Sequence, residues 1–262
     1  MRAGLALLLG RTPTRASVVH DLVRELAAIG VPVRPRVVTA PLGCELAAEV
    51  ASSALLVHKD LSAQVLAGIA RLGTPTCNDV TAELRSLDKA AVMDVLRAAG
   101  LPVPEGRCSS DWREVQALAG RGPLVVKPQV GSQGAGVLLL DGPAPATPLA
   151  PGPWLVQQRV PGDGLDRKLY VTGGRVDGLL RRWPERGAGT PSHPSPELAD
   201  LGRSAARALG LELCGVDVLL APTGPVVVDV NAFPGYKTVP GAAGHLAAHL
   251  SARLSGRVTA CA

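Results

Sequence analysis

Two β-branched runs stand out near the C-terminal end of the sequence: Gly215-Val216-Asp217-Val218-Leu219-Leu220 and Val226-Val227-Val228-Asp229-Val230-Asn231. The breaker-rich segment Pro222-Thr223-Gly224 separates them, so the two runs predict the strands of a β-hairpin. With the turn centred on Thr223, Asp217 lies directly opposite Asp229. Asn231 then shares the face of Asp229, because side chains alternate along a strand.

This arrangement predicts a metal site. Like charges that face each other across a strand pair are destabilising, so a cation is expected between the two carboxylates. Mg²⁺ binds one or two protein carboxylates together with phosphate oxygens of a substrate. Asp217, Asp229 and Asn231 are therefore the candidate ligands of Mg²⁺, with Mn²⁺ as a second possible ion.

The alternative is an ordinary amphipathic hairpin whose acidic face meets water. In the predicted register Val226 and Val228 face the core, while Leu219 and Val227 share the acidic face. Two large apolar residues would make that face a poor solvent surface, which argues for a ligand there. A register slipped by one residue would exchange the two faces. These residues by themselves leave both interpretations open.

Length and composition indicate a globular protein of one to three domains. The chain has 262 residues, of which 47% are hydrophobic and 19% charged, so it can bury a sizeable core. No uncharged apolar run approaches the roughly 20 residues that cross a bilayer. Leu5 to Leu9 resembles the apolar part of a signal peptide, but it is short and Arg11 follows closely, so it predicts a buried strand. We expect a cytoplasmic location without membrane contact.

Cysteine and charge usage argue against other classes. The five cysteines are scattered and form no CxxC pair, which is not typical of a disulfide framework or a zinc ribbon. The net charge is +5, but no long basic run occurs and aromatic residues make up 2% of the chain, so nucleic acid is not an expected partner. Lysine is rare among the basic residues, and we expect it where a compact ammonium is needed. The five lysines are Lys59, Lys89, Lys127, Lys168 and Lys237.

Three segments follow one another along the chain. Residues 1–80 alternate strand and helix patterns, which predicts a small βαβ domain with a parallel sheet. No GxGxxG follows its first strand and no GxxxxGK(S/T) occurs, so neither a Rossmann dinucleotide site nor a P-loop is supported. Residues 81–153 and 154–262 predict two lobes of mixed strands and helices, with a loop over 190–196.

A glycine-rich loop lies between two predicted strands of the second segment. It runs from Gly131 to Gly136, and Lys127 ends the strand that precedes it. Backbone N–H groups of such a loop can approach a polyphosphate, and the lysine adds a point charge to the same phosphates. A plain hairpin loop is the alternative in a chain with 30 glycines. The loop, the lysine and the acidic pair together favour a nucleotide site.

Five motifs occur in a characteristic order: Lys127-Pro128, Gly131-Ser132-Gln133-Gly134-Ala135-Gly136-Val137, Leu155-Val156-Gln157-Gln158-Arg159-Val160, Asp166-x-Lys168, and Gly215-x-Asp217 with Asp229-x-Asn231-x-x-Pro234-Gly235. This ordered set resembles the ATP-grasp superfamily, and most closely its RimK/LysX-type carboxylate–amine ligases. The resemblance covers residues 81–241. It implies the ATP-grasp fold, α/β and α+β, with the βαβ segment as a small pre-ATP-grasp domain.

The resemblance also implies an ATP site. Its members are Lys89 and Lys127 at the phosphates, Ser132 and Gly134 in the loop that covers them, Gln158 and Val160 at the adenine hinge, and Asp166 at the ribose. At the hinge the family more often has Glu followed by an aromatic residue and Ile. The adenine contacts are therefore expected to differ in detail from those of the family.

The positions matched to chemistry depart from the family in places. Asp217, Asp229 and Asn231 match its metal ligands, although the ligases commonly have Glu where this chain has Asp229. Arg182 matches an arginine that steadies the transferred phosphate or the tetrahedral intermediate, with a surface arginine as the alternative. Lys168 is the second candidate catalytic residue and stands where the ligases prefer arginine. No Phe-Arg-x-Asn segment follows Arg182, which leaves the substrate open.

The implied activity is ATP- and Mg²⁺-dependent formation of an amide between a small-molecule carboxylate and an amine, through an acyl phosphate. The basic net charge favours an acidic substrate, and the family implies a possible homo-oligomer. Two alternatives stay open. The segment Ala232-Phe233-Pro234-Gly235-Tyr236 and the run that starts at Lys168 resemble inositol phosphate kinases of the same fold. A non-catalytic nucleotide-binding partner is the other alternative.

Overall fold

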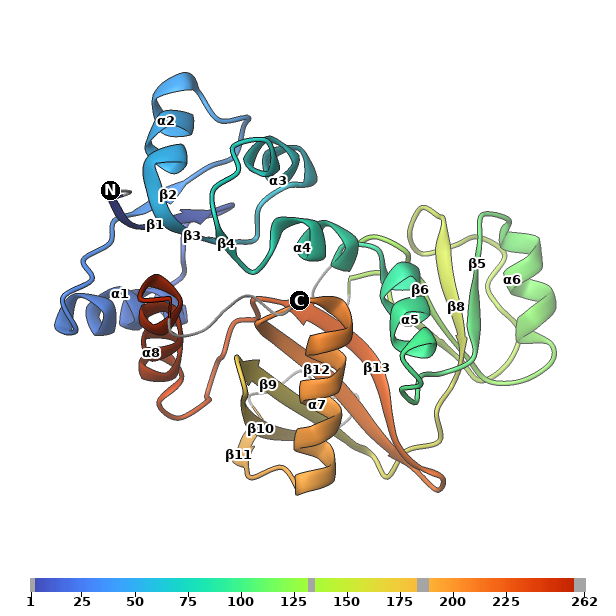
Figure 1. Ribbon diagram of the computed structural model, residues 1–262. Coiled ribbons are helices and arrows are strands. Elements are labelled where there is room, and N and C mark those ends of the chain that lie inside the picture. The colour runs from blue at the N-terminus through green and yellow to red at the C-terminus, as the bar shows by residue number, and fades with distance from the viewer. Residues whose placement is uncertain (1–2, 132–134, 183–188, 257–262) are drawn as a thin grey trace.

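The structure consists of three β-sheets with helices packed on them (Figure 1). The computed structural model describes residues 3–131, 135–182 and 189–256 of the chain. Each sheet is formed by one stretch of sequence, so an N-terminal, a central and a C-terminal sheet follow one another along the chain. This is the mixed α/β and α+β architecture that the sequence predicts.

The N-terminal sheet is parallel and has the strand order β2-β1-β3-β4. Its strands are β1 (Ala3–Leu9), β2 (Pro35–Val37), β3 (Ser53–Lys59) and β4 (Thr76–Cys77), and its crossover helices are α1 (Val18–Ala28), α2 (Cys44–Ser52) and α3 (Ala63–Ala70). Helices cover both faces, so β3 is buried along nearly its whole length. α1 and α3 begin where the hydroxyls of Ser17 and Ser62 accept backbone N–H groups.

Two helices, α4 (Val80–Ser86) and α5 (Lys89–Ala98), lead to the antiparallel central sheet, whose order is β5-β8-β6-β7. Its elements are β5 (Gly106–Ser109), α6 (Trp112–Ala119), β6 (Leu124–Pro128), β7 (Leu138–Leu140) and β8 (Trp154–Gln158). The boundary predicted after residue 153 assigns β8 to the C-terminal lobe, whereas β8 pairs with β5 and β6. We therefore propose a central lobe that extends to Gln158.

The C-terminal sheet is antiparallel with the order β11-β10-β9-β12-β13. Its elements are β9 (Leu165–Thr172), β10 (Arg175–Arg182), β11 (Thr190–Ser192), α7 (Pro196–Leu209), β12 (Leu213–Ala221), β13 (Gly224–Ala232) and α8 (Ala242–Leu254). The predicted loop over 190–196 is partly wrong, because β11 pairs with β10 and covers its otherwise open edge.

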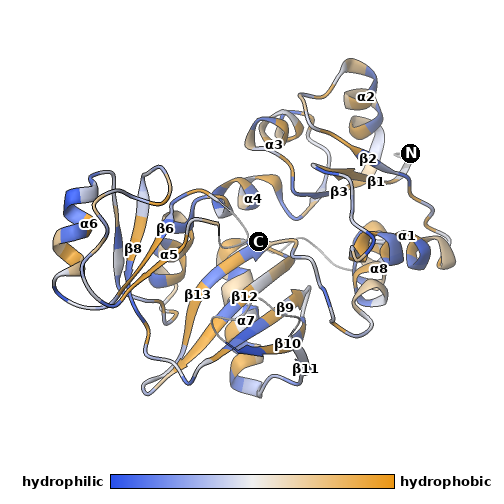
Figure 2. Cartoon of the chain, turned by 180° about the vertical axis from the view of Figure 1, so that it is seen from behind, coloured by the Kyte–Doolittle hydropathy of each residue, from blue (hydrophilic) through white to orange (hydrophobic). Residues whose placement is uncertain are grey.

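One face of the C-terminal sheet is covered and the other is left for a site. α7 lies along the covered face (Figure 1) and packs on Val216 and Val218 of β12 and on Leu169 of β9. The residues between these positions point to the opposite face. Figure 2 shows apolar residues along many strands of the three sheets.

The last helix returns to the first sheet. α8 lies beside α1 in Figure 1, and residues of both helices share one core with β1 and β3. The N-terminal and C-terminal parts of the fold therefore pack together directly. In the part of the chain that the structure describes, no helix has the length and apolar character needed to cross a membrane.

Candidate active site

The hairpin of β12 and β13 carries the predicted acidic pair. Asp217 pairs directly with Asp229, as the sequence predicts. The turn is tighter than predicted, because Ala221 pairs with Gly224 and leaves only two residues between the strands. The pairing shifts by one residue at Asp217/Val218, where Val228 forms a β-bulge in β13. The predicted pair is thus confirmed, but through a bulge and not through a wider turn.

The bulge also changes which valines face the core. Val227 pairs with Val218, and both are fully buried on the side of α7, so the prediction that Val227 shares the acidic face is wrong. Val226 pairs with Leu219 and is half-buried on the acidic face, so the prediction that Val226 faces the core is also wrong. Between the turn and the acidic pair, the bulge therefore reverses which residues of β13 face the core.

The acidic pair and its neighbours suit a divalent cation. Asn231 donates from Nδ2 to Oδ2 of Asp229 at 3.1 Å, so the amide oxygen of Asn231 is available on the same face. Burial raises the pKa of Asp217, the Lys168 ammonium opposes this, and the carboxylates of Asp166 and Asp229 reinforce it. Two carboxylates and an amide oxygen are hard oxygen donors of the kind that Mg²⁺ binds. The residues present therefore fit the predicted ion.

Alternating charges continue across the neighbouring strands. Nζ of Lys168 on β9 lies 2.7 Å from Oδ1 of Asp217, and the two residues are directly paired. Asp166 lies two residues before Lys168 on the same face and forms an ion pair with Arg181 on β10. Burial opposes the charge on Lys168, but the adjacent Asp217 carboxylate raises its pKa above the ordinary value. Basic and acidic groups therefore alternate over β10, β9 and β12, and Asp229 on β13 adds a second carboxylate beside Asp217.

The two adjacent arginines of β10 point to different faces. Arg181 pairs with Asp166 on the charged face, whereas Arg182 pairs with Leu165 and is exposed. The structure therefore brings Arg181, and not Arg182, together with the other candidate residues. Sequence reasoning missed Arg181, although the register of a hairpin that turns at Gly173-Gly174 pairs it with Asp166.

Lys127 joins the central sheet to the hairpin. It lies near the end of β6 and donates from Nζ to the backbone oxygen of Val228, the bulge residue, at 2.8 Å. Burial lowers the pKa of Lys127, and the nearby Asp229 carboxylate acts in the opposite direction. This lysine therefore lies where the central lobe meets the acidic hairpin.

The base of the glycine-rich loop is tied to the start of α5. Lys89, the first residue of α5, donates from Nζ to the backbone oxygen of Gly131. Asp88 caps the helix through Oδ1 and accepts the Gln129 amide at Oδ2, 2.7 Å away. Two further predicted residues of this loop, Ser132 and Gly134, lie outside the described residues.

The predicted adenine hinge lies at the end of β8. Gln158 is exposed there and donates from Nε2 to the Glu105 carboxylate at 3.1 Å, while Val160 is half-buried in the connection to β9. The preceding Gln157 is buried, and its Nε2 has no hydrogen-bond partner among the described residues. Gln157 shares a face of the central sheet with Lys127. Sequence reasoning missed it, although a glutamine within an apolar strand is a signal of a buried polar contact.

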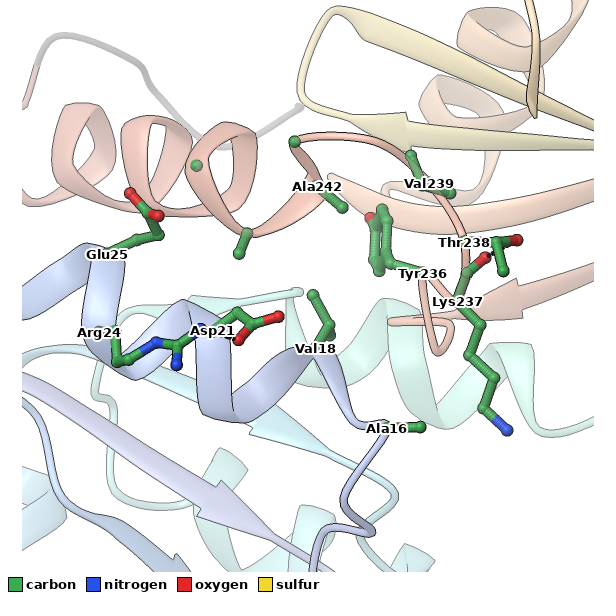
Figure 3. A pocket seen from close by; sticks show the side chains of 13 residues that line it. Ala16, Val18, Asp21, Arg24, Glu25, Tyr236, Lys237, Thr238, Val239 and Ala242 are labelled. Carbon is green, nitrogen blue, oxygen red and sulfur yellow. Dashed lines mark hydrogen bonds and ion pairs between the residues drawn. The ribbon is translucent and has the colours of Figure 1, made fainter.

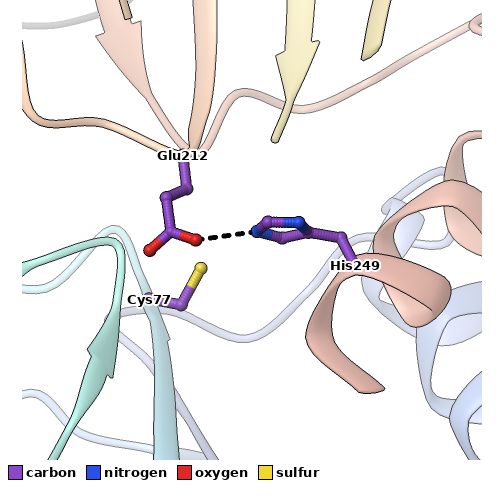
Figure 4. A group of neighbouring side chains, drawn as sticks. All are labelled: Cys77, Glu212 and His249. Carbon is purple, nitrogen blue, oxygen red and sulfur yellow. Dashed lines mark hydrogen bonds and ion pairs between the residues drawn. The ribbon is translucent and has the colours of Figure 1, made fainter. Parts of the chain in front are cut away.

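A second polar cluster lies outside this site. Figure 4 shows Cys77, Glu212 and His249, whose ligand-type atoms lie within 4.8 Å of one another. The Glu212 carboxylate is bound by Nε2 of His249 at 2.9 Å and by Nε of Arg253 at 3.2 Å. Burial raises the pKa of the Cys77 thiol well above its ordinary value, which keeps it neutral. This cluster joins β4, the residue before β12 and α8 through buried ion pairs.

Comparison with known proteins agrees with this geometry. A family model described as the RimK-like ATP-grasp domain matches residues 86–251. A probable alpha-L-glutamate ligase from Xanthomonas campestris is 33% identical over 200 residues, which cover 69% of each chain. A second one, from Halorhodospira halophila, is 30% identical over 200 residues, 69% of this chain and 66% of that protein.

Solved structures share the fold. The RimK domain ATP-grasp protein from Sphaerobacter thermophilus has a TM-score of 0.75 at 22% identity and covers 94% of this chain and 99% of its own. The ATP-grasp ligase PsnB, in complex with minimal precursor, Mg and ADP, has a TM-score of 0.68 at 21% identity over 95% and 98% of the two chains. D-alanine–D-alanine ligase from Bacillus anthracis has a TM-score of 0.68 at 15% identity, with 96% of each chain covered.

The fold and the charged face define an ATP-grasp enzyme, a class that uses ATP with Mg²⁺. The chain belongs to the RimK-like ATP-grasp family and is a carboxylate–amine ligase. Of the alternatives that the sequence left open, the inositol phosphate kinase and the non-catalytic nucleotide-binding partner, neither is favoured by these comparisons.

Proposed function

We propose that this ligase uses ATP and Mg²⁺ to join glutamate, or a closely related acidic amino acid, to a second small-molecule substrate through an amide bond. The names of the relatives, probable alpha-L-glutamate ligases, support glutamate, and the net charge of +5 supports an acidic substrate. The observation that carries the proposal is the charged face of β10, β9, β12 and β13, where two ion pairs adjoin the acidic pair and Lys127 of the central lobe binds the hairpin.

The chemistry explains why such a face is needed. A carboxylate does not react efficiently with an amine near neutral pH, because oxide is a poor leaving group. Transfer of the γ-phosphoryl group of ATP to the carboxylate gives an acyl phosphate and ADP. The amine then attacks the acyl carbon and releases phosphate. Both steps build negative charge that positioned cations stabilise.

Three residues of the hairpin would hold the ion. Asp217, Asp229 and Asn231 supply hard oxygen ligands, and a bound Mg²⁺ neutralises charge on the phosphates of ATP. The Lys168 ammonium, which pairs with Asp217, then lies next to the ion site on the reacting face. It is available to stabilise the transferred phosphoryl group.

The other cations act on the phosphates and on the intermediate. Lys127 and Lys89 approach the phosphates from the central lobe, where each now binds a backbone oxygen. Arg181 is oriented by Asp166 toward the same face, so we assign to it the role that the family resemblance gave to Arg182. Arg182 lies on the opposite face, so it would act only after a rotation of β10 that brings its side chain to the charged face.

The rest of the nucleotide site is proposed from the resemblance. Ser132 and Gly134 would cover the phosphates, Gln158 and Val160 would hold adenine, and Asp166 would contact the ribose. The buried amide of Gln157 shares the face of Lys127 and is an additional candidate for the nucleotide. Use of Mn²⁺, a homo-oligomeric state and the cytoplasmic location expected for an ATP-dependent enzyme stay predictions.

Hydroxamate formation tests the proposal. The protein is incubated with ATP, Mg²⁺, hydroxylamine and single candidate carboxylic acids, since hydroxylamine traps an acyl phosphate whatever the natural amine is. We expect a hydroxamate that depends on one carboxylate and forms with equal amounts of ADP. Glutamate is then added as a competing amine, and it should lower the hydroxamate yield and appear in an amide product.

Two results would contradict the proposal. ADP formation with a phosphorylated inositol phosphate, and without hydroxamate, would favour the kinase. Stoichiometric ATP binding without turnover over a broad panel of acids would favour the non-catalytic alternative. Chelation of divalent ions should stop hydroxamate formation, and Mg²⁺ should restore it.

A further inference from the structure

The phenylalanine and tyrosine side chains of the chain gather at one place. The sequence contains only one Phe and two Tyr among its 262 residues. The ring centroids of Tyr170 and Tyr236 are 5.2 Å apart, and the Phe233 ring lies 6.2 Å from that of Tyr236. We call these three side chains the aromatic cluster. It belongs to the core that α1 and α8 share with β1 and β3, and Phe233 follows two residues after Asn231, a proposed ligand of the ion.

The two tyrosine hydroxyls of the aromatic cluster differ in their partners. Tyr236 donates its hydroxyl to the backbone oxygen of Val171 at 2.9 Å, and its ring lies between Val18 of α1 and Ala242 at the start of α8 (Figure 3). Tyr170 is also buried, but its hydroxyl has no hydrogen-bond partner among the described residues. The hydroxyl of a buried tyrosine usually has a partner, so this one points to a ligand.

Tyr170 continues the charged face along β9. It comes two residues after Lys168 and four after Asp166, so the three side chains share one face of the strand. Burial raises the pKa of Tyr170, and the Lys168 ammonium acts in the opposite direction, so the phenol keeps its proton near neutral pH. The charged groups that act on this hydroxyl all belong to the face of the proposed site: Lys168, Asp217, Arg181 and Asp166.

A glycine brings three parts of this face together. Gly215 of β12 pairs directly with Tyr170. A Cβ atom at Gly215 would lie 3.2 Å from Cε of Lys168 and 3.2 Å from Cβ of Pro234, so a side chain there would push away the lysine or the segment that follows Asn231. The absence of a side chain therefore lets Lys168, Tyr170 and this segment approach one another.

Backbone strain marks the same segment. Among the described residues other than glycine, four have positive φ, and three of them lie in residues 233–238: Phe233 (32°), Tyr236 (49°) and Thr238 (62°). Left-handed backbone is unfavourable at a residue with a side chain and is retained mainly at ligand clamps and active sites. The aromatic cluster thus holds a strained segment against β9 and β12, next to the proposed ion ligands.

The order of residues along β9 follows the order of groups in the reaction. Asp166 is proposed at the ribose and Lys168 at the transferred phosphoryl group. Residues two apart on a strand are separated by about 7 Å, so Tyr170 is the next group beyond Lys168 in the direction away from the ribose. The attacking and leaving oxygens of phosphoryl transfer are roughly in line, so the carboxylate lies on the side of the phosphoryl group away from ADP. This is the side toward Tyr170.

We propose that the Tyr170 hydroxyl is a catalytic hydrogen-bond donor that binds the acyl oxygen of the carboxylate substrate. When the amine attacks, a C–N bond forms and this oxygen becomes an oxyanion. When the intermediate collapses, the C–O bond to phosphate breaks, phosphate leaves with the electron pair, and the amine nitrogen loses a proton to solvent. Tyr170 keeps its own proton and stabilises the oxyanion. This inference rests on the proposed ligase function and adds a residue that acts in its second step.

The test removes the Tyr170 hydroxyl and keeps its ring. In Tyr170→Phe the kcat for hydroxamate formation should fall roughly tenfold to a hundredfold, as for one lost hydrogen bond to a charged oxygen, while the KM for ATP changes less than about twofold. Positional isotope exchange in ATP, measured with the carboxylate and without an amine, should stay within about threefold of wild type, because phosphoryl transfer forms no tetrahedral carbon. The melting temperature should not fall, since no partner among the described residues is lost.

Tyr236→Phe is the matched control. It also keeps the ring, but it removes the donor to the Val171 oxygen, so the melting temperature should fall by about 2–4 °C while both rates stay within about twofold of wild type. An unchanged kcat in Tyr170→Phe would overturn the inference, and so would equal losses of isotope exchange and of hydroxamate formation. A wild-type protein that forms no hydroxamate would defeat the ligase function and this inference together.

Discussion

The two hairpins of the C-terminal sheet differ in their regularity. β9 and β10 pair without interruption from the Gly173-Gly174 turn to Arg182, and their charged face follows strict alternation. β12 and β13 have an equally tight turn, but the register shifts at Val228. The regular hairpin supplies a fixed ion pair, Asp166 with Arg181, whereas the bulged hairpin supplies the candidate ion site.

The bulge has a consequence that a regular ladder lacks. An extra residue in one strand leaves backbone groups outside the ladder and bends the strand. The backbone oxygen of Val228 accepts the Lys127 ammonium, which comes from another sheet. A β-bulge near a reacting centre can therefore connect two lobes, while a regular hairpin only orients side chains.

The largest effect is expected from a substitution that removes a charge from the bulged hairpin. Asp229→Ala should lower the rate of hydroxamate formation by roughly 10³-fold or more, because the ion loses a carboxylate ligand. The melting temperature should stay the same or rise, because the repulsion with Asp217 is relieved. Asp200→Ala, at an exposed position of α7, is the control for surface charge. Near-wild-type activity of the Asp229 variant would refute the assigned ion site.

A smaller effect is expected from substitutions of the two adjacent arginines of the regular hairpin. Arg181→Gln should lower kcat/KM by roughly 10²-fold, and it leaves the buried Asp166 without its ion-pair partner. Arg182→Gln should stay within about threefold of wild type, as for other exposed positions. Adding Asp166→Asn to Arg181→Gln should restore stability but not activity. If Arg182 proved the more sensitive position, β10 would have to rotate during the reaction.

Removal of the bulge tests its role directly. Deletion of Val228 leaves Val218 opposite Val227 and Asp217 opposite Asp229, now in a regular ladder. We expect kcat/KM for ATP to fall roughly tenfold, because Lys127 loses its backbone partner, with a change of about 1 kcal/mol or less in the free energy of unfolding. Val228→Ala keeps the bulge and its carbonyl and should behave like wild type. Equal activity of the two variants would show that the bulge is dispensable.

The smallest effect lies outside both hairpins. His58 of β3 places Nδ1 at 3.3 Å from the Glu83 carboxylate and Nε2 at 2.9 Å from the Asn78 oxygen. Burial lowers the pKa of His58, but Glu83 and Asn78 outweigh it and hold the pKa above 6.5. The contribution of charged His58 to the free energy of unfolding is thus complete below pH 6.5. It is lost as the pH rises through the folded-state pKa, by at most about 1.4 kcal/mol per pH unit.

Chemical unfolding between pH 6 and pH 9 measures this contribution. The difference in unfolding free energy between wild type and His58→Gln should shrink as the pH rises, while hydroxamate formation at fixed pH changes little. A difference that stays constant over this range would mean that the pKa of His58 is the same in the folded and the unfolded protein.

Several parts of the site could be predicted from the sequence because they depend on neighbours along the chain. The two hairpins follow from β-branched runs and breakers, whereas the predicted pairing of Asp217 with Asp229 is reached through a shorter turn together with the bulge. The helix start at Asp88 and the position of Lys127 before the glycine-rich loop are local in the same sense.

Other parts depend on residues that meet only after the sheets have packed. β8 follows the predicted boundary in sequence, but its partners are β5 and β6. The family resemblance indicates Arg182, since the sequence does not show which of two adjacent arginines faces the site, whereas the ladder turns them to opposite faces. The nucleotide contact proposed for Gln157 depends on the tertiary structure, which buries its side-chain amide without a hydrogen-bond partner among the described residues.

The sequence by itself determined the strands and the family of this protein and placed two carboxylates on facing strands of one hairpin, since strand alternation and turn signals act over a few residues. Only the tertiary structure decided where the bulge lies, which arginine faces the site and how the N-terminal sheet reaches the hairpin. Lys59 and Phe233 are 174 residues apart, and their contact depends on the packing of two sheets and on α8 against α1. Such contacts form because burial of the shared core brings distant polar groups together, and no local pattern encodes that geometry.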